Sequence, residues 1–267
     1  MTMNGKLSLM LVSAGALVAA CAGMGPQMGT VTLHLTDAPS TDFQSATVWV
    51  SKVQLVGGAG GPITITDTAA VYDLLSLQNG VTALLGSATI PTGSYEQLRL
   101  IVDSAQVVLA PGLHLVNGDT IAPLKVPSGM QSGIKVNFGG SLRVTPGQTD
   151  IVVDFDVSQS FVLTGPPTGP HGVIFKPVIH ATSQDVSGSI AGTSSPASAH
   201  GMIFAIQGPD TVGSAVADTV SGAYKIFFLA PGTYLVADSA AGFKTDTLTV
   251  TVGNGQAVTG VDFTLAP

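Results

Sequence analysis

The chain is poor in cysteine and in charged residues. Its 267 residues include one cysteine, Cys21, so no intramolecular disulfide can form and any core must be held by packing and backbone hydrogen bonds. Charged residues make up 9% of the chain, against about 25% in typical globular domains. Nine Lys and Arg against sixteen acids give a formal net charge of -7. We therefore expect neither nucleic acid nor an anionic membrane surface as a partner, because both require clustered cations.

Recognisable catalytic motifs are also missing. The sequence has no Gly-x-Ser-x-Gly elbow and no glycine-rich phosphate loop followed by a helix. Its five histidines show no zinc-like spacing. We therefore expect a protein that is not an enzyme.

The N-terminus has the pattern of an export signal. Lys6 precedes an apolar stretch, 7–20, which ends in small residues directly before Cys21. This stretch is shorter than the roughly 20 residues that a membrane-spanning helix needs. It resembles the lipobox of bacterial lipoproteins, which implies a signal peptide over 1–20, lipidation of Cys21 and a tether over 21–29. Because Ala22 and Gly23, not aspartate, follow the cysteine, an outer-membrane location is favoured if the host is Gram-negative.

The rest of the chain is typical of an all-β protein. Alternating apolar and polar residues between many glycine and proline turns predict strands, among them 30–36, 47–56, 95–102, 149–157 and 173–182. Residues 74–85 have the leucine spacing of a helical turn or two. A stretch rich in Ser, Gly and Ala near 185–199 predicts a domain boundary close to Val186. We therefore expect two tandem antiparallel β-sandwich domains, 30–185 and 186–267.

The second predicted domain contains a specific turn pattern. Ser221-Gly222-Ala223-Tyr224 begins a strand, Pro231-Gly232-Thr233-Tyr234 forms a tight turn, and Ala241-Gly242-Phe243 follows. This order resembles the carboxypeptidase regulatory-like, prealbumin-type β-sandwich. The resemblance implies an appended, noncatalytic module in a carbohydrate-binding-like fold class.

The first predicted domain resembles another family through several separate motifs. These are Leu35-Thr36-Asp37-Ala38-Pro39, Asp73-Leu74-Leu75-Ser76-Leu77, Pro91-Thr92-Gly93-Ser94-Tyr95, Asp154-Phe155-Asp156 and Phe175-Lys176-Pro177. Together, over about 29–185, they resemble the bacterial family of unknown function numbered 4382. Its members are commonly exported proteins or lipoproteins, and the resemblance implies no activity.

Two acids are the candidate metal ligands. Asp154 and Asp156 are two apart on a predicted strand, so both should point to one face. With Asp150 and either Asp103 or Asp37 they could form an oxygen cage for calcium. The alternative is that they face solvent or pair with Lys135 and Lys176.

Trp49 is the candidate ligand-binding aromatic. It lies opposite the apolar Val48 and Val50 on a predicted strand, where an exposed ring could stack on a sugar. The alternative, which we favour, is a tryptophan buried in the sandwich core.

These patterns predict a lipid-anchored lipoprotein of the bacterial cell envelope. We expect it to act as a noncatalytic binding or adhesion module that engages carbohydrate. A hydrolase site in the first domain and a purely structural surface spacer remain alternatives. No cofactor other than calcium is suggested, and the sequence does not indicate an oligomeric state.

Overall fold

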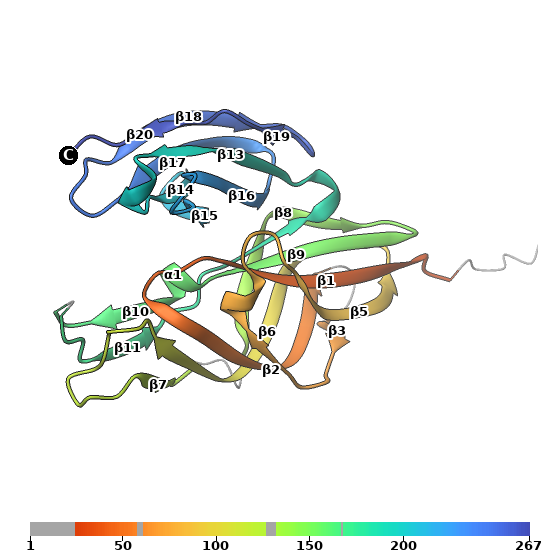
Figure 1. Cartoon of the computed structure of the whole chain (residues 1–267). Helices are drawn as coiled ribbons and strands as arrows, with labels where there is room; N and C mark the ends of the chain where they lie inside the picture. Colours follow the sequence, from red (N-terminus) through yellow and green to blue (C-terminus); the bar gives the residue numbers. More distant parts are fainter. Residues whose placement is uncertain (1–24, 58–60, 127–131, 167) are drawn as a thin grey trace, which may run out of the picture.

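The computed structural model describes residues 25–57, 61–126, 132–166 and 168–267 (Figure 1). Within these ranges nearly all regular structure is β-strand, and the buried apolar residues form two separate clusters. The predicted all-β sandwich class is therefore confirmed. Lipidation of Cys21 lies outside the described residues and stays a prediction.

The first cluster is the core of residues 28–183, here called the N-terminal unit. One sheet has the order β12-β9-β1-β5, and a second has the order β3-β2-β6-β7, with β4 added to β2 and β8 to β6. A hairpin of β10 and β11 completes the unit. The elements are β1 (Met28–Ala38), β2 (Phe43–Gly57), β3 (Ile63–Thr66), β4 (Ala70–Asp73), η1 (Leu74–Leu77), β5 (Ala83–Pro91), β6 (Gly93–Leu109), β7 (Ile121–Leu124), β8 (Ile134–Val144), β9 (Gln148–Asp156), α1 (Val157–Ser160), β10 (Phe161–Thr164), β11 (Gly172–Phe175) and β12 (Ile179–Ser183).

Strand alternation builds this core. Val31, Leu33 and Leu35 of β1 are fully buried, whereas Thr32 and His34 between them are only partly buried on the opposite face of the sheet. The inward face packs into the first cluster. The outward face, which carries His34, is the face on which the C-terminal part of the chain packs.

The second cluster is the core of residues 188–267, here called the C-terminal unit. Its sheets have the orders β16-β13-β19, with β20 also beside β13, and β15-β14-β17-β18. Tyr224 and Tyr234, from the turn pattern noted above, are buried in this core. The elements are β13 (Gly188–Ser195), η3 (Ala197–Ala199), β14 (Met202–Gln207), β15 (Asp210–Val216), β16 (Ala223–Leu229), β17 (Gly232–Ser239), β18 (Asp246–Val252), β19 (Ala257–Val258) and β20 (Phe263–Thr264), preceded by the 3₁₀ turn η2 (Gln184–Val186).

Several local predictions need correction. The expected helical turns over 74–85 are a single 3₁₀ turn, η1, followed by strand β5. Asn79 and Gly80 both have positive φ, 59° and 81°, which ends the turn. The expected strand 173–182 is two strands, interrupted at 176–178. The pairing of β1 with β9 is parallel in a largely antiparallel fold, as are the short pairings of β13 with β19 and β20.

Candidate functional site

The two units meet along the outward face of the β12-β9-β1-β5 sheet, a contact region that we call the junction. In Figure 1 the C-terminal unit lies over the side of the N-terminal unit that carries β1, β8 and β9. Ring nitrogen Nε2 of His180, on β12, lies 2.9 Å from the carbonyl oxygen of Thr211, on β15. This hydrogen bond links β12 of the N-terminal unit to β15 of the C-terminal unit.

A second contact between the units involves the turn that follows η1. The ring of Phe227, on β16, packs so closely on Gly80 that a Cβ atom there would lie 2.9 Å from ring carbon Cε1. The loop that carries Gly80 is held over β1, because Thr36 Oγ1 lies 3.0 Å and 2.9 Å from the carbonyl oxygens of Leu77 and Val81. The C-terminal unit therefore rests on a turn whose shape β1 fixes.

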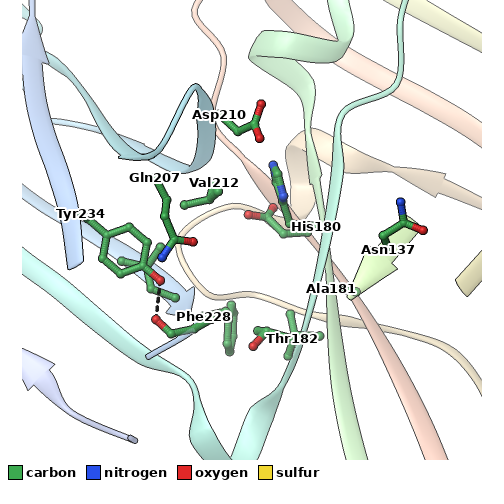
Figure 2. Close-up of a pocket in the computed structure, with 13 residues that line it drawn as sticks. Asn137, His180, Ala181, Thr182, Gln207, Asp210, Val212, Phe228 and Tyr234 are labelled. Carbon is green, nitrogen blue, oxygen red and sulfur yellow. Dashed lines mark hydrogen bonds between the residues drawn. The ribbon is translucent and has the colours of Figure 1, made fainter. Parts of the chain in front are cut away.

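A pocket of about 240 Å³ adjoins the His180 contact. Figure 2 shows Gln207 and Tyr234 on one wall, with His180 and Asn137 towards the other. Strands of both units therefore build this space, which we call the junction pocket. Its lining residues are Asn137, Val152, Asp154, His180, Ala181 and Thr182 from the N-terminal unit and Gln207, Asp210, Val212, Phe228, Leu229, Ala230 and Tyr234 from the C-terminal unit.

One wall of the pocket belongs to a cluster of acids. The parallel register places Thr36 beside Asp154 and Ala38 beside Asp156, which brings Asp37 close to both acids of β9. Asp37 and Asp156 are 5% and 0% exposed. Asp154 is partly exposed as a residue, but its Oδ1 is buried.

Each acid of the cluster has one buried oxygen without a hydrogen-bond partner among the described residues. Asp37 Oδ1 accepts a hydrogen bond of 3.0 Å from the Val157 amide, but its Oδ2 has no partner. Asp156 Oδ1 accepts from Gln159 N at 3.0 Å and from Ser158 Oγ at 2.7 Å, which caps α1, but its Oδ2 has no partner. Asp154 Oδ1 also has none. Such atoms are costly to bury when charged.

Burial raises the pKa values of all three acids, and repulsion by neighbouring carboxylates adds to this for Asp37 and Asp154. Burial first, and then the neighbouring charge of Asp156, raise the pKa of Asp154 from 3.8 to about 7. Burial also raises the pKa of Asp37 well above its ordinary value, and the charges of Asp154 and Asp156 add to this. The pKa of Asp156 is raised by burial and partly restored by its hydrogen bonds and by His180. The cluster therefore holds protons at acidic pH and becomes anionic as the pH rises.

The expected pairing of these acids with Lys135 or Lys176 is wrong. Neither lysine forms an ion pair with Asp154 or Asp156 in the part of the chain that the structure describes. Lys135 instead lies on β8, opposite Arg99 of β6. Asp156 does not face solvent either, because strand β9 ends at the buried start of α1.

The structure shows which other acids lie near Asp154 and Asp156, the two predicted calcium ligands. Asp37 is the acid that joins them, whereas Asp103 accepts a hydrogen bond of 2.8 Å from Ser51 on a different sheet. Oδ1 of Asp150 lies 3.9 Å from Nε2 of His34. Among the described residues, no group of three or more His, Cys, Asp or Glu is placed to hold a metal ion. The calcium site stays a prediction from sequence.

Trp49 does not occupy the core position that we favoured. It is half-buried on the outward face of β2, opposite Val71 of β4 and Ser104 of β6, and it is not part of the first apolar cluster. Val71 beside it is 56% exposed. Trp49 does not line the junction pocket. The structure therefore places it on a separate outer surface.

Sequence reasoning missed the half of the pocket that the C-terminal unit supplies. Phe228 lines the pocket with a φ of 54°, a left-handed conformation that bulky residues rarely adopt. It follows Phe227, whose ring packs on the other unit. The unusual pair of adjacent phenylalanines was the available signal, but a sequence gives no sign of positive φ outside glycine and asparagine.

None of the helices in the described part of the chain is long and apolar enough to cross a membrane.

The fold and the pocket define an all-β protein of two stacked β-sheet units with an acidic pocket at their junction. The chain belongs to the family described as "Domain of unknown function (DUF4382)", whose model matches residues 28–177. This match ends just before β12 and so covers most of the N-terminal unit. No curated protein matches the chain.

Three solved structures show a partial likeness to this chain. The Bacillus anthracis TIE protein is 11% identical with a TM-score of 0.24, and the match covers 90% of this chain but 34% of that one. The major pilin subunit of Bacillus cereus is 10% identical, with a TM-score of 0.23 and coverage of 90% and 70%. The minor pilin of Streptococcus agalactiae is 14% identical, with a TM-score of 0.24 and coverage of 88% and 96%. At these scores the likeness assigns neither fold nor function to this chain.

Proposed function

We propose that this protein is a noncatalytic binding module of the bacterial envelope, and that the junction pocket is its ligand site. The observation that carries the proposal is the composition of the pocket, whose polar side chains come from strands of both units. Binding sites are commonly concave spaces between domains, with a few convergent polar groups on apolar walls. Val152, Val212 and Leu229 supply such apolar walls here.

His180 has a structural role at the junction. Its Nε2 is engaged by the carbonyl oxygen of Thr211, so this edge of the ring serves to join the units. The observation that favours the alternative, a hydrolase, is the pKa of about 7 at Asp154, which suits a general acid or base.

The envelope location rests on the sequence around Cys21. An apolar stretch with a basic residue before it and small residues at its end supports cleavage before Cys21 and attachment of lipid to the thiol. Two or more acyl chains anchor a protein stably, whereas one binds only marginally. The prealbumin-like turn pattern of the C-terminal unit supports an appended adhesion module of the carboxypeptidase regulatory-like type.

The anchor is tested by fractionating cells that express the wild type or Cys21→Ser. We expect the wild type to carry acyl mass and to sediment with membranes, and the variant to lose both. A variant that still sediments, together with a wild type free of acyl mass, would refute the anchor.

The binding role is tested on the mature protein, residues 21–267, by thermal shift against a glycan panel and a panel of small polar metabolites. A ligand that binds only the folded state raises the melting temperature. We expect a hit that Asp154→Asn weakens. Carbohydrate is one class in the panel, and a sugar that quenches Trp49 fluorescence instead would place the site on the outer face of β2. Turnover of a hydrolase substrate that Asp154→Asn abolishes would favour the enzyme.

A further inference from the structure

We infer that the junction pocket takes a small organic cation, a primary ammonium or guanidinium group on a molecule about the size of an amino acid. This inference rests on the proposed binding function and names the chemistry of its ligand.

The charges that line the pocket are of one sign. Asp154 and Asp210 contribute carboxylates from opposite units, and no Lys or Arg is among the lining residues. Among the lining residues, His180 is the one with a titratable nitrogen, and its Nε2 already bonds to the carbonyl oxygen of Thr211. Two carboxylates with no lysine or arginine between them are suited to a cationic ligand, because ionised hydrogen bonds are the strongest that such groups can make.

A carboxylate with one unpartnered oxygen lines this space. Asp154 lines the pocket, and its Oδ1 is buried without a hydrogen-bond partner among the described residues. Behind it, the buried Asp37 and Asp156 each have one further unpartnered oxygen. An ammonium or guanidinium group against Asp154 would supply a hydrogen-bond donor to this carboxyl group and a positive charge beside the two buried acids. A neutral sugar would supply donors alone.

The chain's own nearest lysine is held elsewhere. A much smaller cavity, about 20 Å³, adjoins the same acids and is lined by Asp37, Asp154 and Lys225. The Lys225 ammonium lies 4.5 Å from the centre of the Phe227 ring, in the geometry of a cation–π contact. Lys225 therefore does not occupy the junction pocket.

The remaining walls fit a short cation. Phe228 and Tyr234 place aromatic side chains on the lining, and the amides of Asn137 and Gln207 add neutral hydrogen-bonding groups. The volume, about 240 Å³, is below the range of about 300–1,000 Å³ typical of drug-sized ligands. The ligand is therefore either a free small molecule or one side chain of a partner protein, and both would present the same cationic group.

Arginine and citrulline, each with its α-amino group acetylated, are the matched probes, because the guanidinium is then the single cationic group of the pair and citrulline has a neutral urea of nearly the same shape in its place. Lysine is acetylated in the same way. Isothermal calorimetry on the mature protein at pH 8 should show arginine binding at least about tenfold more tightly than citrulline, with lysine closer to arginine. A short peptide with one internal arginine distinguishes the two sources. Tighter binding of the peptide than of free arginine indicates a protein partner, and the reverse indicates a metabolite.

Three variants locate the site. Asp154→Asn should weaken arginine binding about tenfold or more, and Asp210→Asn, at the exposed rim, severalfold. Asp150→Asn is the control, because Asp150 lies four residues earlier on β9 and outside the pocket, and it should change binding less than twofold. Asp210 is exposed, so its variant still tests the site if Asp154→Asn fails to fold.

The pH dependence gives a further check. The titratable and charged groups around the site are Asp154 and Asp156 on β9, Asp37 and His34 on β1, His180 on β12, Asp210 on β15, Lys225 on β16 and Tyr234 on β17. Arginine affinity should rise as the pH passes about 7, where Asp154 loses its proton.

Two results would overturn the inference while leaving the binding function intact. One is equal affinity for arginine and citrulline, and the other is a neutral sugar that binds in the pocket when arginine does not. An equal loss in Asp150→Asn and Asp154→Asn would also refute the assigned site. Silence towards every compound in both panels would overturn the binding function and the inference with it.

Discussion

Phe227 and Gly80 fit together across the junction, and a side chain at position 80 would have to displace the Phe227 ring. Gly80 has a φ of 81°, and a Cβ atom on it would lie 2.9 Å from ring carbon Cε1 of Phe227. Position 80 thus requires glycine for two independent reasons, backbone conformation and the close approach of a ring. The contact joins a turn of the N-terminal unit to β16 of the C-terminal unit.

Gly80→Ala should therefore destabilise the protein more than a backbone effect alone. We expect the left-handed conformation to cost about 1 kcal/mol and displacement of the ring to add about 1–3 kcal/mol. Gly112→Ala is the matched control, because Gly112 has a φ of 89° but no atom within 4 Å of its Cβ position. Calorimetric unfolding of both variants measures the difference. Equal losses of stability would show that Phe227 does not press on this turn.

The buried acids predict a stability that falls as the pH rises. The pKa of Asp154 is raised from 3.8 to about 7 by burial and by Asp156, and that of Asp37 is also raised by burial. A carboxyl group with a higher pKa in the folded chain stabilises it fully below the unfolded value and loses that contribution as the pH rises through the folded value. The melting temperature should thus drop between pH 4 and pH 8.

Asp154→Asn should flatten this pH profile, because the amide carries no charge at any of these pH values. Asp67→Asn, in the exposed loop between β3 and β4, is the control and should keep the wild-type slope. A melting temperature that rises steadily from pH 4 to pH 8 would contradict the burial of these acids at the junction.

Local pattern was a good guide wherever one face of a strand is buried. Alternation predicted β1 and β9 within a few residues, because a period of two is the direct result of burying one face of a sheet. β13 was missed, since its sequence of Gly, Ser, Ala and Thr is typical of a linker. The structure gives the reason for this composition, because a Cβ atom on Gly192 would lie 1.9 Å from the carbonyl oxygen of Val261.

The candidate site could be predicted only in part for a related reason. The spacing of Asp154 and Asp156 showed that they share a face, and Asp37 was one of the named neighbours. The parallel pairing of β1 with β9 joins segments more than a hundred residues apart, and periodicity does not specify partners. The contribution of Asp210 and Phe228 depends on how the two units stack, which no local pattern encodes.

Trp49 offers a clean test of the outer face of β2, since it is the single tryptophan of the chain. Because its side chain is half-buried and outside the core, we expect iodide to quench its fluorescence partially and Trp49→Ala to cost only about 1 kcal/mol. Phe155→Ala is the comparison, because Phe155 is fully buried and stacks on Phe161 and Phe175. It should cost about 3–5 kcal/mol. Similar losses of stability in both variants would show that Trp49 is a core residue.

The C-terminal unit should fold without the rest of the chain. Residues 186–267 contain the whole second apolar cluster, including Tyr234, Val236 and Phe263, each at most 1% exposed. What the isolated segment loses is the junction, chiefly the Phe227 contact and the His180 hydrogen bond. Because a cluster of this kind is the usual basis of an independent domain, we expect a cooperative melt and a circular dichroism spectrum of β type.

The stability of that segment also reports on the junction. A domain this small is typically stable by about 5 kcal/mol, so loss of the junction should lower its melting temperature relative to the same unit in the intact protein. Phe227→Ser should remove most of this difference, because it lowers the stability of the intact protein but leaves the isolated segment nearly unchanged. A segment that stays disordered at all temperatures would show that the N-terminal unit is required for its folding and that the boundary near Val186 is not a domain boundary.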